Sequence, residues 1–284
     1  MFSYRHAFHA GNHADVLKHL VLVRLLEHLA VKPTPFWVID THAGAGVYAL
    51  DSDWSAKRSE FADGIGRLWG AAGLPAAVAD YVAEVARLNP DGRLRHYPGS
   101  PFIALAHLRA DDRLRLFEAH VNEVDVLAGN VRALGKDAVR RTLVQAGDGF
   151  AGLKALLPPP PRRGLVLIDP SYEDKRDYAR VVTTVREGLA RFATGCYAIW
   201  YPQVQRRESH DLPEKLERLP GIRWLHATLT VRRPSPDGLG LHGSGMFVIN
   251  PPWTLRTALD EALPWLAGAL AQDDGARWSL NGTE

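Results

Sequence analysis

The stretch PTPFWVIDTHAGAG, residues 33–46, decides the fold class. After two prolines, a short apolar run (FWVI) ends in Asp40 and leads straight into a loop that contains Gly44 and Gly46. Glycines in such a loop let the backbone approach a bound molecule closely, and the helix that follows offers free N–H groups. This order predicts a buried strand followed by the first ligand-binding turn of an α/β domain.

Helical and apolar stretches alternate along the chain. Residues 14–30 carry apolar side chains at helical spacing, and residues 54–88 are helical in character with glycine breaks. HYPGSPF, residues 96–102, is typical of a loop that enters a helix with Ser100 as its N-cap. Strand-like runs occupy residues 36–40, 114–118, 142–146, 165–168, 197–201, 224–231 and 245–250. This alternation of helical and strand-like segments predicts a mainly parallel seven-stranded sheet whose last two strands form an antiparallel pair at one edge.

Length and composition are those of an ordinary globular protein. The chain has 284 residues, 46% hydrophobic and 23% charged, which suffices for one large domain or for one domain with an insertion. No run approaches the about 18 apolar residues of a membrane span, and no signal-peptide pattern is visible. The single cysteine, Cys196, excludes an internal disulfide and a cysteine-based zinc cluster. We therefore expect a soluble cytoplasmic monomer without a membrane partner. A net charge of +2 does not by itself indicate nucleic acid.

Four of the predicted strands end in, or lead into, a carboxylate. These residues are Asp40, Glu118, Asp148 and Asp169. A single acid in this position is usually a helix cap or a turn residue. In a parallel sheet, however, all four would share the carboxyl edge, where doubly wound folds bind ligands at the switch point of strand order. The pattern therefore predicts a binding site at this edge.

The glycine loop leaves two cofactor classes open. GAGVYA, residues 44–49, fits the G-x-G-x-x-[GA] pattern of dinucleotide-binding folds, which is a weak signal alone. Such folds place a ribose-binding acid at the end of the second strand, about 20 residues after the glycines. Glu60 and Asp63 lie at this distance without a strand before them, and the first convincing strand-end acid is Glu118. We therefore expect a helical insertion over residues 51–97.

The sequence Asp169-Pro170-Ser171-Tyr172 follows the apolar run GLVLI and suits one kind of chemistry. The exocyclic amine of a nucleobase is a poor nucleophile, because its lone pair is delocalised into the ring. Acceptors for both of its N–H bonds draw it towards a tetrahedral shape and fix its direction of attack. The Asp169 carboxylate and the Pro170 carbonyl are two such acceptors, and the Tyr172 ring offers a stacking face worth roughly 1–3 kcal/mol per base.

The same motif resembles the [DNS]-P-P-[YFW] signature of amino-group methyltransferases that use S-adenosylmethionine, with Ser171 in place of the second proline. SYRHAFHAGNHADVLKH, DTHAGAG, YPGSP, FEAH, GDGF and IDPSYE occur with it in order. Together these motifs resemble the bacterial 23S ribosomal RNA adenine-N6 methyltransferase family over essentially the full chain. The resemblance implies a Rossmann-like methyltransferase domain over residues 1–50 and 98–272 and an inserted helical subdomain over 51–97. Residues 273–284 are expected to form a flexible tail.

The resemblance also implies site residues. Asp169, Pro170 and Tyr172 would form the catalytic turn, called here the catalytic corner. Tyr172 would stack on the target adenine after this base has been flipped out of the RNA base stack. The cofactor, S-adenosyl-L-methionine, would be held by His19, His42, Gly44, Gly46, Ser100, Glu118, Asp148, Gly149 and Asp169. Of these, Glu118 suits the ribose hydroxyls and Asp148 the adenine amine. The substrate, 23S rRNA, would be contacted by Tyr4, Arg5, His6 and Lys18.

Other interpretations remain open at this stage. His6, His9 and His13 lie close together, but without a cysteine or a placed carboxylate ligand no metal site is expected. An adenine-N6 methyltransferase of DNA would carry the same motifs. A nicotinamide-dependent oxidoreductase would use GAGVYA but leaves Asp-Pro-Ser-Tyr unexplained, and a non-catalytic RNA-binding relative would not need the catalytic corner.

Overall fold

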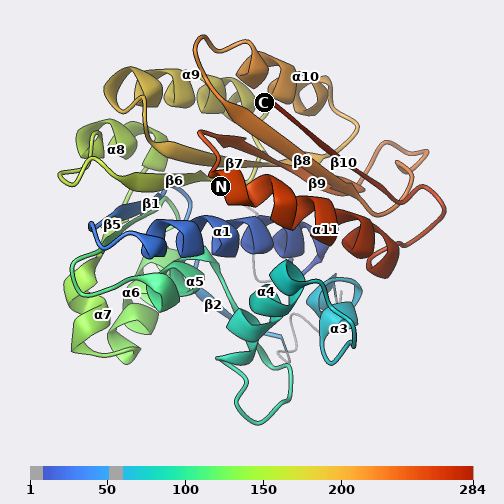
Figure 1. The fold of residues 1–284 in the computed structure, drawn as a ribbon, viewed down its shortest axis with the longest axis horizontal. Helices are drawn as coiled ribbons and strands as arrows, with labels where there is room; N and C mark the ends of the chain where they lie inside the picture. The colour runs from blue at the N-terminus through green and yellow to red at the C-terminus, as the bar shows by residue number, and fades with distance from the viewer. Residues whose placement is uncertain (1–8, 51–59, 284) are drawn as a thin grey trace.

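The computed structural model describes residues 9–50 and 60–283 of the chain. Within these ranges, helices cover both faces of a central sheet of eight strands, and a two-stranded sheet lies beside it (Figure 1). The strands are β1 Trp37–Asp40, β2 Val47–Ala49, β3 His96–Pro98, β4 Arg113–Glu118, β5 Thr142–Ala146, β6 Gly164–Ile168, β7 Cys196–Gln203, β8 Trp224–Thr230, β9 Gly243–Ile249 and β10 Arg277–Gly282. The predicted α/β class is therefore confirmed.

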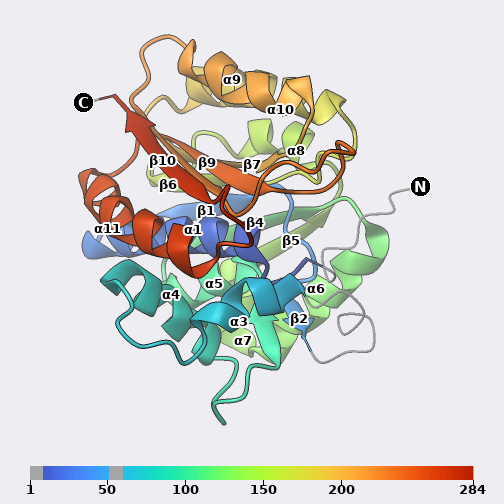
Figure 2. The same cartoon turned by 90° about the vertical axis from the view of Figure 1, so that its right-hand side faces the viewer.

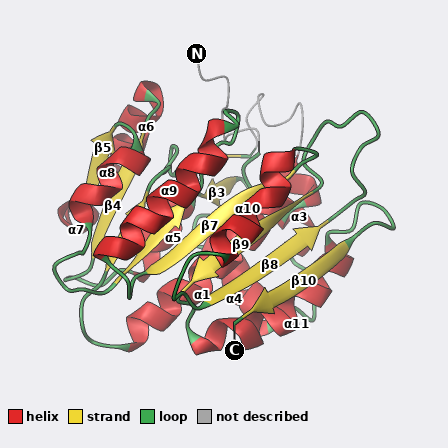
Figure 3. Ribbon diagram, turned by 90° about the horizontal axis from the view of Figure 1, so that it is seen from above, coloured by secondary structure: helices red, strands yellow, loops and turns green. Residues whose placement is uncertain are grey.

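The helices form two layers with an additional layer outside one of them. They are α1 His13–Val31, η2 Glu60–Asp63, α3 Ile65–Leu68, α4 Ala76–Ala86, α5 Ser100–His107, α6 Val121–Ala133, α7 Lys136–Arg141, α8 Gly149–Leu156, α9 Arg176–Arg191, α10 Arg207–Glu217 and α11 Trp253–Ala269. Seen from above, α8, α9 and α10 lie across one face of the sheet (Figure 3). On the opposite face, α1, α5 and α11 pack together, and α4 lies outside α1 and α11 (Figure 2). None of the helices in the described ranges is both long and apolar enough to cross a membrane.

Strand β1 marks the point at which the strand order reverses. The order in the sheet is β10-β8-β9-β7-β6-β1-β4-β5. β1 pairs in parallel with β4 on one side and with β6 on the other, and β5 and β7 extend the parallel part outwards. The chain first builds one half of the sheet through β4 and β5 and then crosses to β6 and β7. A crevice for a ligand is expected beyond the carboxyl ends of the strands at this switch point.

The far edge of the sheet differs from the prediction by one strand. β8 and β9 pair antiparallel, as expected, but the edge position belongs to β10, which pairs antiparallel with β8. The prediction of seven strands and of a flexible tail over residues 273–284 was therefore wrong. The tail is ordered because β8 offers it a free edge, and hydroxyls of Thr228 and Ser279 meet across the pair at 2.6 Å.

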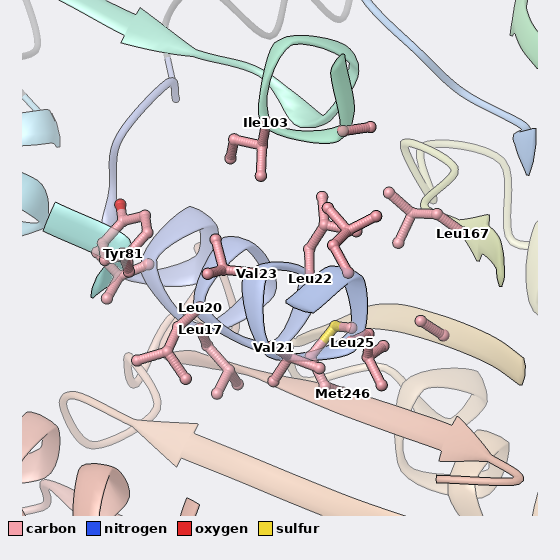
Figure 4. Packing of buried hydrophobic residues seen from close by; sticks show 14 of the residues in the cluster. Leu17, Leu20, Val21, Leu22, Val23, Leu25, Tyr81, Ile103, Leu167 and Met246 are labelled. Carbon is pink, nitrogen blue, oxygen red and sulfur yellow. The ribbon is translucent and has the colours of Figure 1, made fainter. Parts of the chain in front are cut away.

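Helix α1 is the centre of the larger hydrophobic core. It begins after Asn12, whose side chain accepts hydrogen bonds from the backbone N–H groups of Ala14 and Asp15. The helix is buried nearly all round because the sheet, α4, α5 and α11 surround it. Figure 4 shows its side chains between Tyr81 of α4, Ile103 of α5, Leu167 of β6 and Met246 of β9.

The expected insertion joins the rest of the fold through a strand pair that the sequence did not indicate. β2 and β3 pair antiparallel, so that Tyr48 lies opposite Tyr97 and the two ends of the segment are held together. The prediction of a loop at residues 96–98 was wrong for this reason. Arg67 in α3 donates a hydrogen bond of 2.6 Å to the carbonyl of Ala271, and α4 packs on α1 and α11. The described part of the segment is thus built into the main body of the protein.

Candidate active site

Two cavities meet at the tip of β6, where the Asp-Pro-Ser-Tyr motif begins. The larger one, the outer cleft, has a volume of about 630 Å³, and the smaller one, the inner cavity, has a volume of about 140 Å³. Lys18, Asp169 and Ser171 line both of them. Asp169 therefore lies at the boundary between two cavities, the smaller one beside the glycine loop and the larger one lined by α1 and by residues 171–173.

The inner cavity gathers most of the residues that were predicted to bind a cofactor. It is lined by Lys18, His19, His42, Ala43, Gly44, Tyr48, Gly99, Ser100, Glu118, Ala119, His120, Glu123, Asp169, Pro170 and Ser171. Most of them lie at or just after the carboxyl ends of β1, β4 and β6, and the others come from α1, β2, the start of α5 and the first turn of α6. The structure thus brings together side chains that lie far apart in the sequence. Gly46, Asp148 and Gly149 are outside this lining.

The glycine loop is fixed to the tip of β4. The backbone N–H of Gly44 donates a hydrogen bond of 2.8 Å to Oε2 of Glu118, and the N–H of His120 donates one of 2.7 Å to Oε1. Gly44 has a φ of +60°, and a Cβ there would lie 2.3 Å from the Tyr48 hydroxyl. The loop can therefore follow this path only with glycine at the position.

Asp40 at the tip of β1 is buried beneath the loop. Its Oδ2 accepts a hydrogen bond of 2.6 Å from the Ser100 hydroxyl, and its Oδ1 accepts one of 3.1 Å from the backbone N–H of His42. Burial raises the pKa of Asp40 to about 6, although both hydrogen bonds lower it. Ser100 therefore binds the strand tip instead of capping α5, whose N-cap is Gly99.

Two histidines of the inner cavity are held in defined positions. His19 Nδ1 lies 2.7 Å from the Tyr97 hydroxyl, which lies 2.9 Å from the hydroxyl of Tyr81. This buried chain connects α1 with β3 and α4. Burial lowers the pKa of His42 to about 3, so its imidazole is neutral at physiological pH, and its ring packs edge-on against Phe150 at 4.8 Å.

Lys18, which was predicted to contact the RNA, is almost completely buried, although it lines both cavities. The side chain is 5% exposed and lies between two carboxylates, 2.8 Å from Oδ1 of Asp15 and 2.6 Å from Oδ2 of Asp169. Burial disfavours the charged form, but the two carboxylates outweigh burial and raise the pKa of Lys18. Lys18 is buried because other elements enclose α1 on nearly all sides, and its contact with the RNA stays a prediction.

Tyr172 is less accessible than its predicted stacking role suggested. Tyr172 is only 2% exposed, although it lines the outer cleft, and its backbone has a φ of +54°. The hydroxyl donates a hydrogen bond of 2.7 Å to the carbonyl of Trp200, and the ring packs on Tyr178 with centroids 4.5 Å apart. Trp200 is only partly buried and lines the same cleft, with Lys18 Nζ 5.7 Å from its ring centroid. Sequence reasoning missed Trp200, because a tryptophan inside a strand looks like core.

Asp148 and Gly149 stabilise the start of α8. Asp148 is the N-cap, with Oδ1 accepting a hydrogen bond of 3.0 Å from Phe150 N–H, and it also forms an ion pair with Arg180. A Cβ on Gly149 would lie 2.0 Å from the Thr41 carbonyl oxygen, so glycine is needed for this close approach. Contacts of Asp148 and Gly149 with a cofactor stay a prediction.

Comparison with known proteins shows the family to which this chain belongs. A family model described as "Ribosomal RNA large subunit methyltransferase D, RlmJ" matches residues 33–281. The chain belongs to this methyltransferase family. It is 47% identical over 281 residues to ribosomal RNA large subunit methyltransferase J of Haemophilus influenzae. This alignment covers 99% of this chain and 98% of the relative. The Escherichia coli protein of the same name is 47% identical over 270 residues, 95% of this chain and 94% of the relative.

A solved structure agrees with the family over the whole fold. The crystal structure of a Legionella pneumophila protein is 32% identical to this chain and aligns with a TM-score of 0.88. The alignment covers 97% of this chain and 99% of the Legionella protein. The two chains therefore share the same overall fold over nearly their full length.

Two arginines of the described ranges line the outer cleft of this RlmJ-family chain. Arg206, which donates a hydrogen bond of 3.1 Å to the Tyr172 carbonyl, and Arg232 both line it. The predicted RNA contacts Tyr4, Arg5 and His6 lie outside the described residues. The lining also contains His9, whose Nδ1 lies 2.9 Å from Oε2 of Glu60. Among the residues that the structure describes, no group of three His, Cys, Asp or Glu side chains could hold a metal ion.

Proposed function

We propose that this protein transfers the methyl group of S-adenosylmethionine to the N6 amine of an adenine in 23S rRNA, acting as a monomer in the cytoplasm. The observation that carries the proposal is the position of Asp169, at the boundary between the inner cavity and the outer cleft. A methyl donor in the inner cavity and a base in the cleft would meet at this carboxylate.

The residues of the inner cavity fit S-adenosylmethionine. When bound, this cofactor supplies an electrophilic methyl group on a positively charged sulfonium. The carboxylates of Glu118 and Asp169 line the cavity and give it acceptors and negative charge, which Lys18 partly balances. Glu118 suits the ribose hydroxyls, since carboxylates at this strand position bind ribose in doubly wound folds. The backbone of the Gly44 loop, His19 and His42 suit the methionine end.

The catalytic corner would orient the target amine. Asp169 and the carbonyl of Pro170 can accept its two N–H bonds, which turns the lone pair of N6 towards the inner cavity. Lys18 holds Oδ2 of Asp169 at 2.6 Å and so fixes the plane of the carboxylate. Correct alignment of nucleophile and electrophile is worth up to roughly 7–11 kcal/mol. Transfer would join N6 to the methyl carbon while the bond from that carbon to sulfur breaks; S-adenosylhomocysteine would leave, and N6 would give up one proton to water.

The outer cleft would receive the adenine after it swings out of its stack. Tyr172 and Trp200 line this cleft with aromatic side chains. Arg206 lines it too and supplies positive charge for the phosphates of the RNA backbone. Tyr4, Arg5 and His6, in the segment that precedes α1, are proposed to contact the RNA.

A transfer assay on two nucleic acids tests the proposal. The purified protein is incubated with methyl-labelled S-adenosylmethionine and either 23S rRNA that lacks the modification or duplex DNA, and the product nucleosides are separated. We expect N6-methyladenosine in the RNA and no label in the DNA. Label in DNA alone would support the DNA methyltransferase. A thermal shift with NAD, and none with S-adenosylhomocysteine, would support the oxidoreductase and contradict our proposal.

A further inference from the structure

The loop between β8 and β9 holds an apolar side chain at the mouth of the outer cleft. This loop, residues 231–242, joins two strands that lie side by side in the sheet (Figure 1). Leu239 is 71% exposed and yet belongs to the cleft lining, together with Gly238, Gly240 and Leu241. The flanking glycines have φ values of +77° and +86°, a conformation that turns the chain sharply on each side of Leu239.

Hydrogen bonds within the loop fix its shape. The backbone N–H of Leu239 donates a bond of 2.9 Å to Oδ1 of Asp237, and that of Gly238 donates one of 3.0 Å to the Ser235 carbonyl. On the other side, Arg232 donates a bond of 3.0 Å to the Leu241 carbonyl. A loop fastened in this way keeps the leucine exposed in one place, although exposure of an apolar side chain gains nothing for the isolated protein.

The chemistry of the site explains why an apolar group would be useful there. An adenine in folded RNA must leave its stack before its N6 amine can reach Asp169, and unstacking is costly. Proteins that distort nucleic acids insert leucine, isoleucine or phenylalanine between base steps. Arg206 and Arg232 line the same cleft and suit phosphates, whereas the acids Glu60 and Asp63 belong to η2 of the inserted segment.

We infer that Leu239 is an apolar wedge that enters the RNA stack at the place which the target adenine leaves. This inference rests on the proposed function, and it names the residue that holds the RNA open during methylation. The backbone of this loop would lie along the RNA near Arg232. The Leu239 side chain would contact the two bases that flank the position left by the target adenine.

Two substrates and three variants test the wedge. The substrates are a synthetic RNA hairpin that carries the mapped target adenine and its neighbouring sequence in the stem, and an unpaired oligonucleotide of the same local sequence. For Leu239→Ala we expect kcat/KM to fall roughly tenfold on the hairpin and less than about twofold on the oligonucleotide, because only the hairpin must be unstacked. Leu239→Met, which keeps the apolar volume, should retain most of the activity. Leu134→Ala, an exposed leucine that does not line the cleft, should change neither value.

A direct readout of the base position complements the kinetics. With 2-aminopurine at the target position and S-adenosylhomocysteine present, the wild-type protein should raise the fluorescence of the hairpin, and Leu239→Ala should lose most of this rise. An unchanged hairpin rate in Leu239→Ala would overturn the inference, and so would an equal loss on both RNAs. A change of sedimentation in the variant would assign Leu239 to self-association instead. Failure of the wild-type protein to methylate either RNA would refute the proposed function itself, which is a different result.

Discussion

The ammonium of Lys18 lies 2.6 Å from Oδ2 of Asp169, although 151 residues separate the two in the sequence. The contact fastens α1 to the tip of β6, and Asp15 holds the same ammonium from the other side at 2.8 Å. A buried charge is costly unless it is paired, so both carboxylates depend on the ammonium that lies between them. The orientation of Asp169 therefore depends on a helix that is distant from it in the sequence.

The first prediction concerns this buried set. Lys18→Met leaves Asp15 and Asp169 next to each other without a cation, and we expect the free energy of unfolding to fall by roughly 3–5 kcal/mol. Urea denaturation measures this loss. Lys154→Met is the control, because its ion pair with Glu187 is exposed and should change stability by no more than about 1 kcal/mol. Equal, small effects in both variants would show that the buried set does not stabilise the fold.

The second prediction is a pH dependence that comes from Asp40. Burial raises its pKa from 3.8 to about 6, so the native state binds the proton more tightly than the unfolded chain. The stability that this proton provides is present below pH 3.8 and is lost as the pH rises through 6. Compared with Asp40→Asn, the wild-type protein should lose about 2–3 kcal/mol of unfolding free energy between pH 4 and pH 7. A difference that does not change over this range in urea titrations would contradict the burial argument.

The third prediction compares the effects on stability of replacing two glycines that lie in helices. Gly149→Ala would place a Cβ 2.0 Å from the Thr41 carbonyl, and the resulting overpacking should cost roughly 2–3 kcal/mol of stability. Gly129→Ala in α6 meets only the end of the Arg132 side chain at 3.9 Å and should stabilise the protein by up to about 1 kcal/mol. Thermal unfolding of the two variants decides the point, and a stable Gly149→Ala protein would mean that α8 can move away from β1.

The fourth prediction tests the role of β10. Removal of residues 273–284 exposes the edge of β8, which otherwise pairs with β10 along its length. We expect a lower melting temperature and association of the truncated protein, because an open strand edge pairs with other chains. Light scattering and thermal unfolding measure both effects. A truncated protein that stays monodisperse and melts like the full chain would show that β10 is dispensable.

The strand-tip acids could be predicted from the sequence, and the reason is geometric. Parallel strands that alternate with helices bring their carboxyl ends to one edge, so Asp40, Glu118 and Asp169 had to lie near one another. Asp169 and Glu118 line the inner cavity, and Asp40 lies beneath it. The loop at Gly44 was equally predictable, because its backbone conformation requires glycine.

The remaining features depend on packing that no local pattern encodes. In ADVLKH, an acid in the first helical turn and a lysine three residues later look like a surface pair. Only the enclosure of α1 turns Asp15 and Lys18 into an internal ion pair. RWSLNG, residues 277–282, has little strand character, and it forms β10 because β8 supplies the edge. The burial of Tyr172 follows from its contacts with Tyr178 and Trp200, which lie on other elements.

The central claim is that Asp169 orients the adenine amine towards the methyl group, and methylation of 23S rRNA by Asp169→Ala tests it most directly. Lys18 keeps its partner Asp15 in this variant, so the protein should fold and bind S-adenosylhomocysteine in a calorimetric titration. We expect N6-methyladenosine formation to fall at least about a hundredfold, while Asp174→Ala, which removes an exposed acid paired with Arg176, retains full activity. Normal turnover in a folded Asp169→Ala protein would contradict the account.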